Sequence, residues 1–441
     1  MNLYWQKKLL NLYALFFLER GYRVMKKALK DPSFWLEAQN KAIPNFAKYI
    51  YTIPFYRKRF EDAGITAQAI RTGEDFKKLP PLTKEEYRAY LTEGTKDKNK
   101  FKDWMNRQTT GSSGSPLDLY SLPTDRAAEI ANLFRCALIQ DCGYNPLFDR
   151  IFSTMVPKPS APPKKFALPY IAKMSSISEP KDLVEGYNLA KPDFYYGNKT
   201  AILMIATYAL ENGIPLHVPK CLGSISEPLY ESDRKTINAA FGEGKLFDIY
   251  GCAETGNFAV DKPSQPNCHF IWHDTHVVNL TNEETNPENS NVSTGQLMLT
   301  SLIHKGFPLV NYIVGDTLEL TKKNGVPFIT KILGRTNDVI KNLDGSSFKW
   351  MHINRVMFGL TDIAQFRVIQ KSYTDLIFVL AAPKFSAERK KEVESQIKNR
   401  ALEYFGSDLK TTGKNIKIEW TDRIPPDPTG KIRILVSEIK E

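Results

Sequence analysis

The spacing of apolar and polar residues predicts alternating helices and strands in the first part of the chain. Residues 20–105 have helical spacing, interrupted where Pro80 and Pro81 precede Thr83, which we expect to cap a helix with an acidic first turn. Further on, helical patterns alternate with short apolar runs, giving helices at 125–140 and 200–212 and strands at 151–156 and 214–218. This alternation predicts an α/β fold with helices layered on a buried sheet.

The pattern changes to β after residue 253. Strands are expected at 269–280, 295–302 and 317–320, with the polar residues 281–294 as an exposed connection. The last hundred residues predict a small α+β unit with strands at 365–370, 376–381 and 416–420 and a helix at 386–405. Because 441 residues exceed one core of usual size, we expect a large N-terminal domain, residues 1–333, and a small C-terminal domain, residues 334–441.

Composition narrows the class of protein. The chain is 42% apolar and 25% charged, as folded soluble proteins are. Its five cysteines form no paired framework and no Cys-x-x-Cys motif, which favours a reducing compartment, the cytoplasm. The net charge of +11 is spread along the chain without a nucleic-acid motif, so we expect polyanionic small ligands rather than nucleic acid.

One apolar stretch, residues 9–18, lies near the N-terminus. Lys7 and Lys8 precede it, and Glu19 and Arg20 follow it. It is too short to span a bilayer, and no small-residue cleavage site follows it. We expect an amphipathic helix docked on the protein; the alternative is an interfacial helix that makes peripheral contact with a membrane.

A loop rich in hydroxyls and glycines suits the binding of phosphate. Its residues are Thr109, Thr110, Gly111, Ser112, Ser113 and Gly114. Glycines let backbone N–H groups approach an anion, and the hydroxyls add donors without bulk. No Lys follows Gly114, so this is not the loop of kinases or ATPase motors.

Three later segments carry charged groups next to tight turns. The segment from Asp248 through Tyr250 and Gly251 reads as a strand that ends in a turn and presents the Glu254 carboxylate. The segment from Tyr312 to Asp316 has the same design, and such acids suit a ribose diol or a magnesium ion. Close to the end of the chain, a turn rich in Pro and Gly presents the ammonium group of Lys431.

In order and spacing, these segments resemble the adenylate-forming acyl ligase superfamily, most closely the branch of phenylacetate–coenzyme A ligases and CapK-like proteins of capsular polysaccharide. A fifth segment, Gly334-Arg335-Thr336-Asn337-Asp338, lies where the pattern changes to the smaller domain and belongs to the same resemblance. The resemblance covers nearly the whole chain and includes the segments Ile53-Pro54-Phe55-Tyr56, Leu79-Pro80-Pro81-Leu82-Thr83-Lys84 and Ser226-Glu227-Pro228-Leu229. The chain departs from the family pattern at Asn311, where relatives often carry Arg, and at Asn337.

The resemblance implies a role for each matched residue. It makes 1–333 an adenylation domain with the ATP and acyl pocket, and 334–441 a lid that carries the catalytic Lys431. Glu254 would act in catalysis by binding magnesium, and Asn337 would fall at the hinge. The residues implied in ATP or AMP binding are Thr109, Thr110, Gly111, Ser112, Ser113, Gly114, Ser226, Glu227, Pro228, Asp248, Tyr250, Gly251, Asp316 and Arg335.

The implied activity is ATP-dependent activation of a small carboxylic acid as an acyl-adenylate, followed by transfer to coenzyme A, with Mg²⁺ as the metal. A CapK-like enzyme of surface polysaccharide synthesis, which passes the acyl group to a saccharide or carrier protein, is an alternative. A non-catalytic nucleotide-binding paralogue is another. Separately, Cys268, His269 and His273 raise the hypothesis of a zinc site, against the simpler interpretation of a strand near the site.

Overall fold

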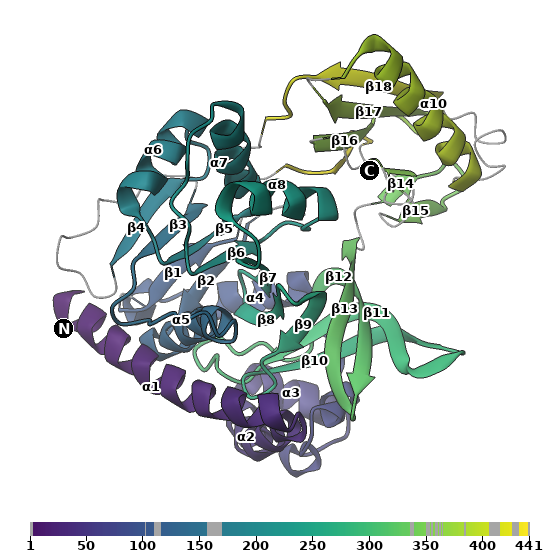
Figure 1. The fold of residues 1–441 in the computed structure, drawn as a ribbon. Coiled ribbons are helices and arrows are strands. Elements are labelled where there is room, and N and C mark those ends of the chain that lie inside the picture. Colours follow the sequence, from purple (N-terminus) through teal and green to yellow (C-terminus); the bar gives the residue numbers. More distant parts are fainter. Residues whose placement is uncertain are drawn as a thin grey trace. The chain divides into compact units, whose positions relative to one another are not determined.

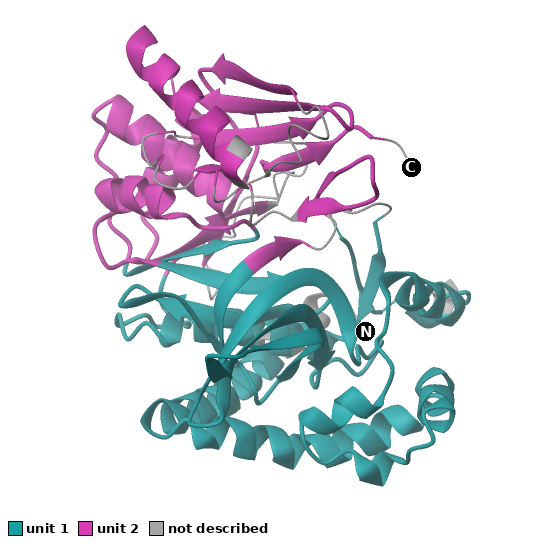
Figure 2. Cartoon of the chain, turned by 90° about the vertical axis from the view of Figure 1, so that its right-hand side faces the viewer, with its two compact units in different colours: residues 1–149, 220–226, 247–332 teal, residues 150–219, 227–246, 333–441 magenta. Residues whose placement is uncertain are grey.

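The described chain divides into two units, each assembled from separate stretches of sequence (Figure 2). The computed structural model describes residues 3–101, 103–109, 116–156, 170–335, 339–349, 353, 356–357, 360, 363, 365–382, 385–404, 415–425 and 432–439. Unit 1 comprises residues 1–149, 220–226 and 247–332, and unit 2 comprises residues 150–219, 227–246 and 333–441. The predicted domain boundary between residues 333 and 334 stays a prediction.

Unit 1 combines a helical N-terminal part with a long, largely antiparallel sheet (Figure 1). Its helices are α1 (Leu3–Lys30), α2 (Ser33–Tyr51), α3 (Pro54–Asp62), η1 (Ala67–Ala69), η2 (Glu74–Lys78), α4 (Lys84–Gly94), η3 (Lys98–Phe101) and α5 (Pro123–Leu138). Its strands are β1 (Met105–Gln108), β2 (Asp118–Ser121), β6 (Cys221–Ile225), β7 (Leu246–Cys252), β8 (Gly256–Lys262), β9 (Gln265–Ile271), β10 (His276–Asn286), β11 (Asn289–Ser301), β12 (Tyr312–Lys323) and β13 (Val326–Arg335).

The sheet of unit 1 runs in the order β10-β11-β12-β13-β9-β8-β7-β6, and a separate hairpin pairs β1 with β2. The pairs β10/β11, β11/β12 and β7/β8 are antiparallel. One face buries a cluster that includes Phe258, Leu297, Leu299, Leu318 and Ile329. Alternate residues of β10, β11 and β12 supply this cluster, as the period of two requires.

Unit 2 contains parallel strands with helices and a second, separate sheet. The parallel strands have the order β5-β3-β4, from β3 (Ile151–Val156), β4 (Ile171–Ser175) and β5 (Phe194–Asn198), with helices α6 (Pro180–Ala190), α7 (Lys199–Glu211) and α8 (Glu231–Phe241). The second has the order β18-β17-β16-β19, from β16 (Gln365–Gln370), β17 (Asp375–Ala381), β18 (Asn415–Thr421) and β19 (Leu435–Ser437). Along the chain, the short pair β14 (Val339–Lys341) and β15 (Ser347–Lys349) precedes this sheet, and helix α10 (Ala387–Tyr404) lies between β17 and β18.

These elements confirm the predicted α/β class with a small C-terminal α+β part. The helices expected at 125–140 and 200–212 are α5 and α7, and the strand expected at 151–156 is β3. The strands and helix expected after residue 365 are β16, β17, α10 and β18. Thr83 caps α4 in a capping box with Glu86, whose carboxylate accepts a hydrogen bond from the Thr83 backbone.

The strand predicted at 214–218 is wrong, because these residues form no strand and the next strand begins at Cys221. Pro215 has no N–H for a sheet ladder. The segment instead bonds to the end of α6: Asn188 donates its amide to the Pro215 carbonyl and accepts from the His217 N–H. Side-chain hydrogen bonds therefore replace the ladder that the apolar pattern suggested.

The predictions for residues 269–280 and 281–294 are also wrong in detail. The first range is divided between β9 and β10 by a turn, in which the N–H groups of Thr275 and His276 both donate to the Trp272 carbonyl. The second is mostly strand, because β10 continues to Asn286 and β11 begins at Asn289. Its polar composition reflects exposed strands with bulges rather than a loop.

A buried arginine joins several parts of unit 1. Arg135 of α5 makes two hydrogen bonds to the Asp274 carboxylate, at 3.1 and 2.9 Å, and its guanidinium carbon lies 4.3 Å from the centre of the Trp272 ring. A Cβ atom on Gly21 would lie 2.9 Å from the Arg135 side chain, so glycine lets α1 approach α5 closely.

Within the ranges described, no helix is both long and apolar enough to cross a bilayer.

Two histidines, His273 within the β9–β10 turn and His276 at the start of β10, should make stability depend on pH. Burial lowers the pKa of His273 to about 4, and burial together with the charge on His304 lowers the pKa of His276 to about 3. Below pH 6.5 the unfolded chain therefore binds protons that the folded chain does not, and stability falls as pH falls. We expect a loss of about 1.4 kcal/mol per pH unit for each histidine between pH 6.5 and 4.

Urea unfolding of the wild type and of His276→Gln across this range measures the effect. The variant should have a shallower pH slope, and a comparison at pH 7.5 supplies the baseline because both histidines are then neutral in both states. An unchanged slope in the variant would contradict the prediction.

Candidate functional site

The turn after β7 is shaped by glycine and presents Glu254. A Cβ atom on Gly251 would lie 2.5 Å from the Gly256 carbonyl oxygen and 2.8 Å from the Asn257 Cα, so no side chain fits there. Gly256 has φ of +77°, in the left-handed region that favours glycine. The hairpin therefore closes tightly, and Glu254 lies half-buried within the turn.

Tyr250 and Asp316 bring two predicted site segments together. The Tyr250 hydroxyl donates to the Asp316 Oδ2 atom at 2.6 Å, although three strands separate β7 from β12 in the sheet order. Gly315 precedes this aspartate with φ of +91°. Both Tyr250 and Asp316 are half-buried, so a ligand can reach the phenol and the carboxylate.

A second tyrosine forms the reciprocal contact. The Tyr312 hydroxyl donates to the Glu254 Oε1 atom at 3.0 Å. Burial and the neighbouring Glu254 charge raise the pKa of Tyr312, which keeps its phenol protonated as a donor. Each segment thus has the form Tyr-x-x-x-acid, and each tyrosine binds the acid of the other segment. The crossed pair fixes the two carboxylates relative to each other.

A buried carboxylate behind these segments gathers three basic side chains. Glu129 of α5 accepts two hydrogen bonds from Arg107, at 2.5 and 2.6 Å, one from Arg126 at 2.5 Å and one from His304 at 2.8 Å. Burial alone would raise the pKa of Glu129, but His304 and Arg107 hold it below its ordinary value. The His304 Nδ1 atom lies 2.6 Å from the Ser301 hydroxyl, which completes the network.

This network lies next to the turn that carries Glu254. A Cβ atom on Gly256 would lie 2.9 Å from the Glu129 side chain, so glycine lets the turn pack against α5. Burial opposes the charge on Arg107, but Glu129, and more weakly Cys252 and Glu254, raise the pKa of its guanidinium. A fixed positive charge therefore acts on the candidate magnesium ligand.

Arg107 also lies on β1, which leads into the predicted phosphate loop. The next residue but one, Thr109, is buried; its N–H donates to the Leu117 carbonyl and its hydroxyl accepts from the Leu117 N–H at 2.9 Å. Thr109 and Leu117 thus close the base of the loop. Thr110, Gly111, Ser112, Ser113 and Gly114 lie outside the described residues.

Asp248 is held inside the fold. Its Oδ2 atom lies 3.0 Å from the His269 Nε2 atom, and its backbone N–H donates to the Asp261 carboxylate. The site role of Asp248 stays a prediction, and this buried pair gives it a structural role in fixing β7.

The zinc site suggested for Cys268, His269 and His273 stays a prediction, and the structure uses the two histidines in other contacts. No group of three or more His, Cys, Asp or Glu side chains in the described part of the chain could hold a metal ion. The ring nitrogen of His269 faces Asp248, and that of His273 faces the Pro327 carbonyl at 3.0 Å. The two rings are therefore used in separate hydrogen bonds within the fold.

The remaining predicted residues are distributed over both units. Ser226, in unit 1, directly follows β6 with φ of +77°. Glu227, in unit 2, accepts hydrogen bonds from the Thr200 N–H at 3.0 Å and the Thr200 hydroxyl at 2.6 Å, and Pro228 is exposed. Arg335 ends β13, with its side chain exposed. Asn337 and Lys431 lie outside the described residues.

Sequence reasoning missed the residues behind the site. Arg107, Glu129 and His304 are far apart in sequence and belong to no motif, and Tyr312 was noted only as the start of a segment. One signal existed for Tyr312, because the equal spacing of Tyr250-Glu254 and Tyr312-Asp316 is visible in the sequence. A glutamate within the helical pattern of α5 gave no such signal, since most such residues face solvent.

Comparison with known proteins identifies one sequence relative. The chain is 24% identical to the protein CapK of Staphylococcus aureus over 447 aligned positions, covering 94% of this chain and 92% of CapK. No protein-family model matches the chain.

Solved structures with a similar fold include CoA ligases. A 2-hydroxyisobutyryl-CoA ligase in the postadenylation state, in complex with 2-HIB-AMP, has a TM-score of 0.69 at 16% identity, covering 91% of this chain and 89% of that one. The predicted resemblance to the adenylate-forming acyl ligases is thus confirmed for the fold, and the resemblance to CapK is confirmed as a similarity of sequence. An anthranilate–CoA ligase, AuaEII, in complex with anthranoyl-AMP shares this ligase fold over 75% of the chain and 65% of its own, with a TM-score of 0.51 and 16% identity.

Removal of the charge on Glu129 should destabilise the folded chain strongly. Glu129→Gln leaves the half-buried guanidinium of Arg107 and the side chains of Arg126 and His304 without a carboxylate. We expect a loss of about 3–5 kcal/mol in the free energy of unfolding, measured by urea denaturation. Glu93→Gln, at an exposed position on α4, is the matched control and should change stability by less than about 0.5 kcal/mol. Equal effects of the two substitutions would contradict the role of Glu129.

Proposed function

We propose that the chain is an ATP-dependent, carboxylate-activating ligase that forms an acyl-adenylate and transfers the acyl group to coenzyme A. The observation that carries the proposal is the crossed pair of Tyr250 with Asp316 and Tyr312 with Glu254. It brings together the two acids that the family resemblance assigns to ribose and to magnesium. The ligases of the same fold that were solved with acyl-AMP support this assignment.

The first reaction joins two anions. A carboxylate oxygen of the acid attacks the α-phosphorus of ATP, a new O–P bond forms, and pyrophosphate leaves with the electrons of the broken P–O bond. Catalysis of such a step consists mainly of positioning and charge neutralisation. We assign the positioning of ribose to Asp316 and the neutralisation of the transferring phosphate to Lys431.

The second reaction consumes the acyl-adenylate. The sulfur of coenzyme A attacks the acyl carbon, the bond from that carbon to the AMP oxygen breaks, and the thiol gives its proton to solvent. A 2-hydroxyisobutyryl-CoA ligase solved in complex with 2-HIB-AMP and CoA has a TM-score of 0.55 to this chain and supports coenzyme A as acceptor.

Glu254 fits the proposed magnesium ion. Its carboxylate is half-buried, and Tyr312 orients one oxygen by a hydrogen bond. Magnesium prefers one or two carboxylates together with substrate phosphates, and it supplies charge neutralisation at the phosphates. Glu254 would hold the ion at the end of the β7 turn.

The experiment also tests a second acyl acceptor, because the chain is similar in sequence to CapK. A CapK-like enzyme of surface polysaccharide synthesis would use the same first reaction and then pass the acyl group to a saccharide or carrier protein. Pyrophosphate exchange detects the first reaction under either alternative, and coenzyme A consumption separates them.

The decisive measurement is carboxylate-dependent exchange of labelled pyrophosphate into ATP with Mg²⁺, across aryl, fatty and hydroxy acids. We expect exchange with at least one class of acid, and Lys431→Ala should lower its rate by about 10²-fold or more while nucleotide binding persists. Lys181→Ala, an exposed lysine of α6, is the matched control and should leave the rate unchanged. ATP binding without exchange for any acid would contradict the proposal and favour a non-catalytic nucleotide-binding protein.

The tyrosine that orients Asp316 should affect binding more than turnover. Tyr250→Phe removes one hydrogen bond, worth about 1 kcal/mol, and we expect the KM for ATP to rise about fivefold with kcat little changed. Initial rates of pyrophosphate release at varied ATP measure both constants. Tyr208→Phe on α7 is the control for loss of a phenol elsewhere. A fall in kcat at constant KM would contradict a role in ground-state binding.

A further inference from the structure

Helix α1 docks on unit 1 through a narrow stripe of small and apolar residues. Ala14, Leu18, Gly21, Met25 and Ala28 recur every three or four residues and are buried. The helix packs along α5 and against α2 (Figure 1). These buried residues attach α1 to the rest of unit 1.

The first part of the same helix carries apolar side chains that the docking stripe does not use. Leu12 is 64% exposed and Phe16 63% exposed, and Tyr13 and Leu15 are exposed as well. Leu12 and Phe16 are four residues apart and therefore lie one above the other on the helix. Exposed large apolar residues grouped on one element mark an interaction surface.

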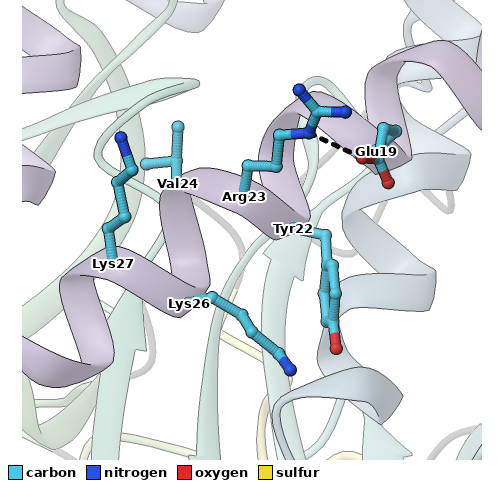
Figure 3. Close-up of a pocket in the computed structure, with 6 residues that line it drawn as sticks. All are labelled: Glu19, Tyr22, Arg23, Val24, Lys26 and Lys27. Carbon is cyan, nitrogen blue, oxygen red and sulfur yellow. Dashed lines mark hydrogen bonds and ion pairs between the residues drawn. The ribbon is translucent and has the colours of Figure 1, made fainter.

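The second part of α1 is strongly basic. Residues 19–30 contain five cationic side chains and one carboxylate, Glu19. Glu19 pairs with Arg23 at 2.6 Å. Figure 3 shows residues that line a hollow along this part of α1, with Arg23 and Lys27 on one side of the helix and Tyr22 and Lys26 on the other. The hydrogen bond with Tyr22 raises the pKa of Lys26, which therefore stays charged.

We propose that α1 rests on an anionic lipid surface, with its exposed apolar residues inserted at the interface and its cations on the headgroups. Leu12, Phe16, Arg23 and Lys27 follow one another at spacings of four, seven and four residues, which places them on one side of the helix. Apolar side chains combined with Lys and Arg are the features of helices that lie in the interface plane. This surface is independent of the proposed ligase site.

Charge complementarity favours lipid over a second copy of the chain. A symmetric dimer on this surface would place two copies of the same basic helix together, and both carry a net positive charge between residues 19 and 30. An anionic headgroup layer supplies the opposite charge along the whole basic part of α1. The apolar residues then enter the boundary of the acyl chains, where burial removes them from water.

Co-sedimentation of the full chain with vesicles tests the proposal. We expect binding to an equal mixture of phosphatidylcholine and phosphatidylglycerol, weak binding to phosphatidylcholine alone, and loss of binding at high salt. The double variant Leu12→Glu/Phe16→Glu should bind the anionic vesicles at least about tenfold more weakly. Arg23→Gln/Lys27→Gln should also weaken binding, by removing the charge contribution.

Leu189→Glu is the matched control, since it places a carboxylate at an exposed leucine of α6 outside α1. It should bind vesicles like the wild type. Thermal unfolding midpoints close to that of the wild type show that the α1 variants remain folded. Vesicle binding equal in the wild type and in Leu12→Glu/Phe16→Glu would overturn the proposal. So would a concentration-dependent dimer, seen by sedimentation velocity, that this variant abolishes.

Discussion

The candidate site depends on one buried carboxylate. Glu129 is itself almost fully buried and accepts hydrogen bonds from Arg107, Arg126 and His304. A buried charge of this kind is tolerated only when opposite charges surround it. Because its partners come from β1, α5 and the segment before β12, the same ion cluster fixes the entry to the phosphate loop and the approach to Asp316. The turn of Glu254 packs on it through Gly256.

Helix α5 connects this network with the docking of α1. Glu129 lies towards the β7–β8 turn, and Arg135, further along the helix, lies against Trp272 and next to Gly21 of α1. Both residues are charged and almost fully buried, and each has its carboxylate or guanidinium partner within hydrogen-bond distance. A helix with two such anchors holds its neighbours in a defined register. Helix α5 therefore supports both α1, which carries the lipid surface that we propose, and the turn that carries Glu254.

Sequence patterns predicted the elements whose burial follows a simple period. Helix α5, strand β3 and the C-terminal α+β part follow the apolar spacing directly, because one face of each is buried. The errors arose where side chains replaced a backbone ladder, as at Asn188 beside residues 214–218, or where exposed strands carried polar residues, as at 281–294. Motifs predicted the acids of the candidate site, but Glu129 depends on partners distant in sequence, which no local pattern encodes.

The chain departs from the family pattern at Asn311, and the local fold shows what the asparagine does there. Asn311 has φ of +54°, a conformation that asparagine tolerates better than most residues, and its amide donates to the Phe76 and Leu79 carbonyls at 2.6 and 2.9 Å. An arginine there would lose this fit, because its longer side chain cannot replace a short amide between two carbonyls. The residue thus fixes the start of β12, and with it Tyr312. Tyr312 binds Glu254, and the same strand continues to Asp316, which Tyr250 binds. Asn311 therefore supports the positions of both acids, although it departs from the family motif.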